Sequence, residues 1–357
     1  METLVLNTTD LGEIVRRVGL NTLMDEMMTH LSDAFIHYEP AKFRTPPRDG
    51  LHYLDPNYGL LEWMPTLENG KRITIKHVGY HPNNPILHRS STILSTIQAF
   101  DPVNGHLLSI MDATFLTALR TGAASAILSK RLARAGSSTL GLIGAGAQAV
   151  TQLHALSRCF DIDRILVYDT KDSHAATFDE RTSFSRAPQE ILSRDSLPRM
   201  LEQVDILCTC TSEEPGKGPV FNDGTHAPWL HINAVGSDFE GKVELPFSLL
   251  QRSTVCPDFL AQAKKEGECQ QLEDNEIGPG MIELLQHPSR YESLREELTV
   301  FDSTGWALED HVGLTMISQY ANEFNLGRMM NIELTASDPL DPYGSFPPMT
   351  TATERTY

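Results

Sequence analysis

Thr139-Leu-Gly-Leu-Ile-Gly144-Ala-Gly146-Ala-Gln-Ala149 is the stretch that decides the fold. Its apolar start predicts a buried strand over 139–144, and its continuation predicts a helix over 146–158. Between them, Gly144 allows a tight turn, Gly146 lets the backbone approach a pyrophosphate, and Ala149 keeps the helix close to the strand. The free N–H groups at the start of such a helix bind phosphate.

A second strand is predicted over 164–168, and it ends at Asp169. The separation from Ala149 to Asp169 is about that expected between a dinucleotide fingerprint and the carboxylate that binds the ribose. An acid there favours a free 2′-hydroxyl, and therefore NAD over NADP. The alternative is a glycine-rich turn that binds no nucleotide.

The pattern around the fingerprint alternates strand and helix, which is typical of a parallel sheet with crossover helices. We predict further strands over 249–256 and 298–301, and a helix over 305–325. The segments that carry the alternation are 139–144, 146–158, 164–168, 199–203, 204–210 and 229–235.

About 125 residues precede the expected nucleotide-binding domain. They predict helical structure within 4–35, a loop over 37–58, and a long helix over 115–135. Two strand pairs are expected, over 60–64 with 72–78 around Asn69-Gly70, and over 92–100 with 106–111. We therefore expect an α/β protein in which a Rossmann-type domain (126–309) is joined to an α+β substrate or dimerisation domain built from both termini (1–125 and 310–357). The proline-rich tail from Ala336 is expected to be extended, with its last residues disordered or on another surface.

The composition narrows the class of partner. A net charge of −18 and a pI near 5.1 argue against nucleic acid or an anionic membrane as partner. We expect no membrane span and no signal peptide. Five cysteines form no disulfide framework, and Cys208-x-Cys210 predicts two buried thiols in preference to a metal site. The absence of a disulfide framework predicts a reducing, cytoplasmic setting. The histidines show no metal-binding spacing, so we predict no catalytic metal.

Asp238 and Lys242 follow a predicted strand, at the end where ligands bind in open α/β sheets. An acid near a nicotinamide ring can take a proton from an ammonium group and later return it. The alternative is a loop aspartate that caps the next helix.

Lys76 stands between apolar residues, and a buried lysine needs an anion such as a substrate carboxylate. The alternative is a lysine that points outward from a half-exposed strand. Arg120 lies in a small-residue helix, where it could bind a carboxylate or phosphate in a bidentate manner or form a structural ion pair. Ser303-Thr304 could line a cofactor or cap the following helix.

Taken together, the ordered blocks resemble the ornithine cyclodeaminase/mu-crystallin family over roughly residues 1 to 345. Within the family, the run 140–157 and the block around Cys269 are most similar to the bacterial members that cyclise lysine. The carriers of the resemblance are Glu62-Trp-Met-Pro, Lys76, Ala118-Leu-Arg-Thr-Gly-Ala-Ala-Ser, Gly144-Ala-Gly-Ala-Gln-Ala, Asn233-Ala-Val-Gly-Ser-Asp, Gly241-Lys-Val-Glu-Leu, Glu266-Gly-Glu-Cys-Gln-Gln-Leu and Phe301-Asp-Ser-Thr-Gly-x-Ala-x-Glu-Asp.

The resemblance implies a two-domain homodimer that holds NAD and acts on a small amino acid. It implies that Asp238 is the acid/base residue, and that Arg48, Lys76 and Arg120 hold the substrate carboxylate. Glu62, Met64 and Thr304 would line the amino-acid pocket. The implied cofactor contacts are Thr92, Arg120, Gly144, Gly146, Ala147, Gln148, Asp169, Thr211, Val235, Lys242 and Ser303.

The activity implied is a redox-neutral conversion of L-lysine to L-pipecolate and ammonia, in secondary metabolism, with NAD recycled in place. Three alternatives stay open. The substrate could be L-ornithine, giving L-proline, because one methylene in a pocket is worth only about 1–3 kcal/mol. The same scaffold could carry a net oxidoreductase, such as a ketimine reductase or an amino-acid dehydrogenase. It could also bind nucleotide and ligand without catalysis.

Overall fold

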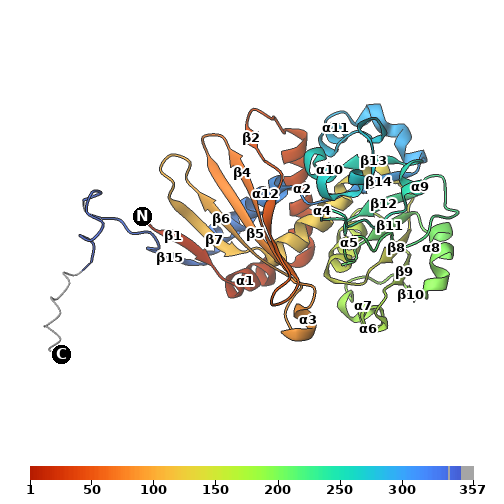
Figure 1. Ribbon diagram of the computed structural model, residues 1–357, viewed down its shortest axis with the longest axis horizontal. Coiled ribbons are helices and arrows are strands. Elements are labelled where there is room, and N and C mark those ends of the chain that lie inside the picture. The colour runs from red at the N-terminus through yellow and green to blue at the C-terminus, as the bar shows by residue number, and fades with distance from the viewer. Residues whose placement is uncertain (337, 347–357) are drawn as a thin grey trace.

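Two β-sheets with helices between and around them make up the protein (Figure 1). The computed structural model describes residues 1–336 and 338–346. We call the eight-stranded, mostly antiparallel sheet "sheet A" and the seven-stranded parallel sheet "sheet B". The mixed α/β fold class expected from the sequence is confirmed. Residues 337 and 347–357, and with them the prediction for the end of the tail, lie outside the described residues.

Sheet B has the strand order β10-β9-β8-β11-β12-β14-β13, and every neighbouring pair is parallel. The order reverses between β8 and β11, which is the point where doubly wound sheets bind ligands. The prediction of a strand over 249–256 is partly wrong. Its first residues belong to a short helix that ends at Leu250, and only residues from Thr254 onward pair with the sheet. The strands are β8 (Thr139–Ile143), β9 (Arg164–Tyr168), β10 (Gln189–Ile191), β11 (Ile206–Thr209), β12 (His231–Ala234), β13 (Thr254–Pro257) and β14 (Thr299–Asp302).

The helices around sheet B follow its strands in the chain. α5 begins directly after the fingerprint glycines, as predicted. These helices are α5 (Ala147–Ser157), α6 (Asp172–Ala176), α7 (Phe178–Arg181), α8 (Leu197–Gln203), α9 (Phe247–Leu250), α10 (Leu260–Glu266) and α11 (Met281–Gln286), with 3-10 turns η1 (Arg194–Ser196), η2 (Glu268–Gln271), η3 (Asp274–Glu276) and η4 (Pro288–Glu296).

Sheet A has the order β15-β1-β7-β6-β5-β4-β2, with β3 also pairing to β4. The two predicted strand pairs are confirmed, whereas the predicted loop over 37–58 contains β2 and β3. Short strands such as β1 are not predicted by sequence periodicity, because they are stabilised by pairing with distant parts of the chain. The strands are β1 (Thr3–Leu6), β2 (Phe43–Arg44), β3 (Asp49–Tyr53), β4 (Gly59–Glu68), β5 (Arg72–Tyr80), β6 (Ile93–Phe100), β7 (Leu107–Asp112) and β15 (Arg328–Met330).

Three long helices lie between the two sheets and form most of the core (Figure 1). α4 (Thr114–Leu132) contacts β6 of sheet A and also β12 and β14 of sheet B. α2 (Leu20–Ile36) and α12 (Ala307–Phe324) pack against it. The inner face of sheet A is thereby brought next to sheet B. The remaining helices are α1 (Thr8–Val18), which Asn7 caps, and α3 (Asn84–Leu87).

A second apolar cluster fills the other face of sheet B, so this sheet is covered on both sides. No helix among the described residues is long and apolar enough to cross a membrane.

Candidate active site

The carboxyl edge of sheet B collects most of the residues that the sequence predicts for cofactor binding. Each of five neighbouring strands ends one or two residues before one of them. Because all these strands are parallel, their carboxyl ends meet at one edge. The residues are Gly144 after β8, Asp169 after β9, Thr211 after β11, Val235 after β12 and Ser303 after β14.

The turn after β8 has the shape that a pyrophosphate requires. Gly144 has φ +92°, and a Cβ there would lie 2.6 Å from the Cys210 carbonyl oxygen, so a side chain is excluded. A Cβ on Gly146 would meet nothing within 4 Å, which leaves open space at the start of α5. Within the described part of the chain, no side chain caps α5, so its first N–H groups are available to an anion.

Two further observations at this edge fit a dinucleotide. The Ser303 hydroxyl is buried and has no hydrogen-bond partner among the described residues. Asp169 lies beside the fingerprint turn, where its carboxylate accepts hydrogen bonds from the amides of Ala145 and Lys171, both at 2.8 Å. The edge therefore combines a turn at Gly144 that fits a phosphate, an acid, Asp169, that could bind a ribose, and the buried hydroxyl of Ser303.

The positions of three further predicted cofactor residues do not by themselves indicate a role in cofactor binding. Ala147 and Gln148 open α5, and the Gln148 side chain accepts a hydrogen bond from Thr151 at 3.2 Å. Thr92 lies just before β6 in sheet A, where its carbonyl accepts a hydrogen bond from the His81 amide. Their roles toward a cofactor stay predictions.

Glu244 organises the ends of β11 and β12, and the sequence analysis did not single it out. Its buried carboxylate accepts hydrogen bonds from the Thr209 hydroxyl (2.6 Å), from the Thr211 amide and hydroxyl (both 2.7 Å), and from the Gly236 amide (2.7 Å). Burial raises its pKa, while these donors act in the opposite direction. The available signal was one acid between two apolar residues, in Val243-Glu-Leu245.

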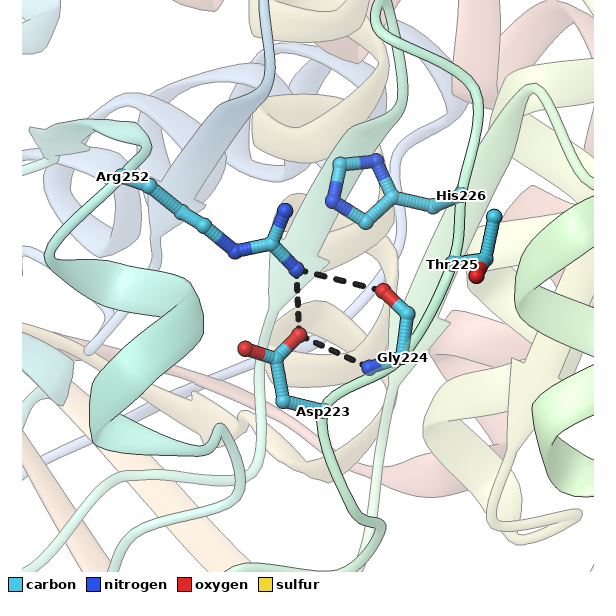
Figure 2. Close-up of a pocket in the computed structure, with 5 residues that line it drawn as sticks. All are labelled: Asp223, Gly224, Thr225, His226 and Arg252. Carbon is cyan, nitrogen blue, oxygen red and sulfur yellow. Dashed lines mark hydrogen bonds and ion pairs between the residues drawn. The ribbon is translucent and has the colours of Figure 1, made fainter.

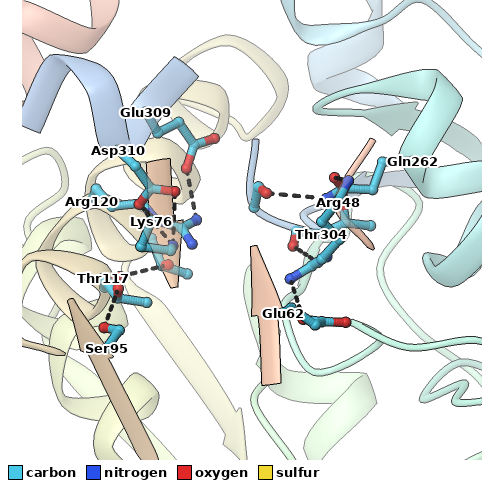
Figure 3. Close-up of polar contacts among 12 residues, drawn as sticks. Arg48, Glu62, Lys76, Ser95, Thr117, Arg120, Gln262, Thr304, Glu309 and Asp310 are labelled. Carbon is cyan, nitrogen blue, oxygen red and sulfur yellow. Dashed lines mark hydrogen bonds and ion pairs between the residues drawn. The ribbon is translucent and has the colours of Figure 1, made fainter. Parts of the chain in front are cut away.

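On the inner face of sheet A, Lys76, Arg120, Glu309 and Asp310 form a cluster that we call the inner cluster (Figure 3). Nζ of Lys76 lies 2.8 Å from each carboxylate oxygen of Asp310. Arg120 donates from Nε to Asp310 at 3.2 Å and from Nη1 to Glu309 at 2.8 Å. All four side chains are buried. Lys76 therefore points inward and meets an anion, as predicted, but the anion is a protein carboxylate.

Burial is the main cause of the pKa shifts of Lys76 and Glu309. It lowers the pKa of Lys76 to about 8, although Asp310 favours the ammonium form. It raises the pKa of Glu309 to about 7, against the influence of Arg120. The sequence analysis quoted Glu309 and Asp310 only within a family block. The sequence signal for them was the presence of two acids among apolar residues at the start of the predicted helix over 305–325, because a buried acid needs a charged partner.

A second group, the outer cluster, surrounds Arg48 and contains Glu62 and Thr304, which Figure 3 shows, and Glu266. Arg48 donates from Nε to Glu266 at 2.5 Å and donates a second hydrogen bond to the Thr304 carbonyl. Nη1 of Arg48 lies 3.6 Å from Glu62. Burial disfavours the Arg48 cation, but Glu266 and Glu62 outweigh it and raise the pKa of Arg48. Burial raises the pKa of Glu266 to about 7.

The predicted pocket residue Thr304 is held by the protein itself. Its hydroxyl donates to Asp258 at 3.0 Å and accepts from Gln262 at 2.9 Å. Met64 is buried and lies opposite Lys76 in the β4–β5 register, on the same inner face. The substrate contacts of Thr304 and Met64 stay predictions.

Asp238 is the most open of the candidate catalytic groups. Its carboxylate accepts a hydrogen bond at 2.8 Å from the buried ammonium of Lys242, which also lies 5.5 Å from the centre of the Tyr80 ring. The rings of Phe239 and His52 are 4.4 Å apart, so the loop that carries Asp238 packs on β3 of sheet A. Asp238 thus stands where sheet A meets the carboxyl edge of sheet B.

A shallow surface hollow of about 520 Å³ lies elsewhere (Figure 2). It is lined by the segment Asp223–His226, which leads into the start of β12, and by Arg252, just before β13. It therefore opens at the amino-terminal edge of sheet B, away from the residues above. Among the described residues, no group of three or more histidine, cysteine or acidic side chains is arranged to hold a metal ion.

Comparison with known proteins places this geometry in a family. The model of the ornithine cyclodeaminase/mu-crystallin family matches residues 10–325. The chain belongs to the ornithine cyclodeaminase/mu-crystallin family. This confirms the resemblance noted in the sequence.

Individual relatives sharpen the comparison. L-lysine cyclodeaminase of Streptomyces rapamycinicus is 40% identical over 96% of this chain and 99% of the relative. Alanine dehydrogenase of Archaeoglobus fulgidus is 34% identical over 92% of this chain and 98% of the relative. A solved lysine cyclodeaminase, described as recognising L-lysine, L-ornithine and L-2,4-diaminobutyric acid, superimposes with a TM-score of 0.93 at 43% identity over 97% of this chain and 100% of that one.

Proposed function

We propose that this protein is an NAD-dependent L-lysine cyclodeaminase, which converts L-lysine to L-pipecolate and ammonia. One observation carries the proposal: two buried clusters with three cationic side chains adjoin a strand edge that fits a dinucleotide. The extensive identity to an L-lysine cyclodeaminase supports it. NAD would lie along Gly144, Gly146, Asp169 and Ser303.

The substrate carboxylate is held by Arg48, Lys76 and Arg120. These side chains come from three separate parts of sheet A and α4, and each is already oriented by a protein carboxylate. Such clamping places Cα of the substrate in one orientation and removes the entropic cost of finding it. The Arg120 guanidinium packs against Gly305, in the turn that follows Ser303 and Thr304, so it would lie between the carboxylate site and the cofactor edge.

The charges at the site favour a substrate with two amino groups. Acidic side chains outnumber basic ones here. Burial raises the pKa of Glu266 and Glu309 to about 7, and a bound ammonium group would favour their ionised form, so the site suits a ligand of positive net charge. A diamino acid with one carboxylate and two ammonium groups carries a net positive charge, whereas the net charge of zwitterionic alanine is zero. The acids are Glu62, Asp238, Asp258, Glu266, Glu309 and Asp310, against Arg48, Lys76, Arg120 and Lys242.

Asp238 moves protons at the substrate amines. The reaction forms a bond from the side-chain nitrogen to Cα and breaks the bond from Cα to the α-nitrogen, which leaves as ammonium. When bound, NAD supplies a temporary hydride acceptor at Cα and returns the hydride, so no net oxidation results. The Asp238 carboxylate takes the proton that makes an amine nucleophilic, and Lys242 keeps that carboxylate in place.

An isotope experiment tests the proposal against its alternatives. Purified protein is incubated with catalytic NAD⁺ and α-¹⁵N-labelled L-lysine or L-ornithine, and the products are analysed by mass spectrometry. We expect unlabelled pipecolate and labelled ammonia from lysine, without accumulation of NADH. Proline from ornithine alone would move the assignment to the sister activity. NADH accumulation with L-alanine, suggested by the similar alanine dehydrogenase, would identify a net oxidoreductase.

The domain division and the homodimer belong to the same proposal. In this proposal, the NAD-binding domain (126–309) is built on sheet B, and the substrate domain (1–125 and 310–357) is built on sheet A. Five cysteines without a disulfide partner suit the cytoplasmic setting expected from the sequence, and secondary metabolism is the expected context.

The outer face of sheet A supports the homodimer. Leu51, Leu61, Gly79 and Leu94 are direct neighbours across β3, β4, β5 and β6, so they form one row on that face. Leu51, Leu61 and Leu94 are 63%, 42% and 50% exposed. A solved relative, 32% identical over 93% of this chain, is described as an archaeal alanine dehydrogenase dimer with bound NAD. We assign a second copy of this chain to cover the row.

Charges in this row are therefore expected to break the dimer. We predict that Leu61→Glu with Leu94→Glu yields a monomer in sedimentation-velocity experiments, because two carboxylates per protomer would be desolvated in the interface. Ile191→Glu, at an apolar residue 56% exposed on the edge strand β10, serves as the matched control and should leave the dimer intact. A double variant that sediments like the unaltered protein would contradict the assignment of this face.

A further inference from the structure

Lys76 and Arg120 come from two different elements of the fold. Lys76 is on β5 and Arg120 is on α4, and both side chains are long and rotatable. Two cations held near each other in a buried site repel, and repulsion would drive their charged groups apart. A carboxylate-binding site made from them therefore needs a third group that fixes their separation.

Asp310 has the position of that third group. One of its oxygens, Oδ1, accepts from both Lys76 at 2.8 Å and Arg120 Nε at 3.2 Å (Figure 3). Its neighbour Glu309 accepts from the opposite side of the same guanidinium at 2.8 Å. Both acids lie in the first turn of the 18-residue helix α12, where the helix dipole stabilises negative charge.

The edge of the guanidinium between Nη1 and Nη2 is also packed against the backbone. A Cβ on Gly305 would lie 2.6 Å from Nη1 and 2.8 Å from Nη2 of Arg120, so the Gly305 backbone packs directly on the guanidinium. The Gly305 amide in turn donates to Asp258 at 2.6 Å. Arg120 is thus enclosed by two acids and a fixed turn, with little freedom to rotate.

We infer that Asp310, assisted by Glu309, is a positioning residue that sets the separation and orientation of Lys76 and Arg120 toward the substrate carboxylate. This inference rests on the proposed function. Asp310 acts through the two cations and makes no contact with the substrate itself. The acid pair would therefore determine how strongly the site binds the carboxylate of an amino acid.

Asp310→Asn tests this inference, because the amide keeps the size of the side chain and removes its charge. We expect KM for L-lysine to rise on the order of 10- to 100-fold, with a smaller fall in kcat, since charge-assisted hydrogen bonds are weakened. Binding of NAD, measured by calorimetry, should stay within about twofold of the unaltered protein. Glu323→Gln, an exposed acid on the same helix, is the matched control.

Acid rescue distinguishes positioning from structural damage. Lys76 is faced by Asp310 from α12, Arg120 from α4, Glu62 from β4 and Arg48. Asp310 is the carboxylate that supports its ammonium form, so the Asn variant lowers the Lys76 pKa below about 8. Lys76 then loses its proton near neutral pH and regains it at lower pH. The ratio of variant to unaltered kcat/KM should rise by up to about tenfold per unit of pH lowered across that range.

Each outcome decides one question. A KM increase with acid rescue supports the inference, whereas an unchanged KM, or a loss that no pH restores, overturns it. If the unaltered protein makes no cyclic product, the proposed function fails. The inference is then tested by calorimetric binding of L-lysine with NAD present, where Asp310→Asn should weaken binding and Glu323→Gln should not.

Discussion

Replacement of Asp238 by asparagine is expected to lower kcat for cyclisation by about a hundredfold to ten-thousandfold, the contribution of a positioned acid/base group. The amide matches the carboxylate in size but cannot take up or return a proton. The asparagine oxygen can still accept the hydrogen bond that Lys242 donates to Asp238 at 2.8 Å, so we expect NAD binding to change little. Steady-state kinetics and NAD binding by calorimetry measure the two effects separately.

Two comparisons make this prediction decisive. Glu240→Gln removes an exposed acid two residues along the same loop and should leave kcat unchanged. Asp238→Glu keeps the acid and should retain part of the activity. Full turnover in Asp238→Asn would show that another group transfers the proton. Glu266 would then be the first candidate, because burial raises its pKa to about 7.

The cofactor edge was predictable from the sequence because its signals are local. The fingerprint turn, the strand before it and Asp169 lie within about thirty residues, and each has a backbone or charge requirement that a single sequence expresses. The long helix α4 and the β4–β5 hairpin were predictable for the same reason. Periodicity and a turn at Asn69-Gly70 indicate them without reference to any distant partner.

The carboxylate partners of the site were not predictable in this way. Lys76 and Asp310 are 234 residues apart, and Arg48 and Glu266 are 218 apart, so no spacing rule connects them. The sequence analysis could state that a buried lysine needs an anion, but it assigned that anion to the substrate. The packing of α12 on β5 supplies it from the protein, and only the assembled fold brings the two together.

Arg120→Met is expected to reduce both stability and substrate binding strongly. The methionine fills a similar volume, but it leaves Glu309 with no cation and Asp310 with Lys76 alone, in positions that are fully buried. Removing one partner of a buried ion pair costs about 3–5 kcal/mol, because the remaining charge stays desolvated. We expect a lower unfolding midpoint in urea for the ligand-free protein, and kcat/KM for L-lysine reduced by roughly a hundredfold or more.

The double variant Arg120→Met with Glu309→Gln separates the two consequences. Neutralising Glu309 removes the unpaired charge, and Lys76 still balances Asp310 at 2.8 Å, so most of the lost stability should return. The kinetic defect should persist, because the guanidinium that holds the substrate carboxylate is still missing. If catalysis recovered together with stability, Arg120 would be a structural residue, and the carboxylate would have to be held by Arg48 and Lys76 without it.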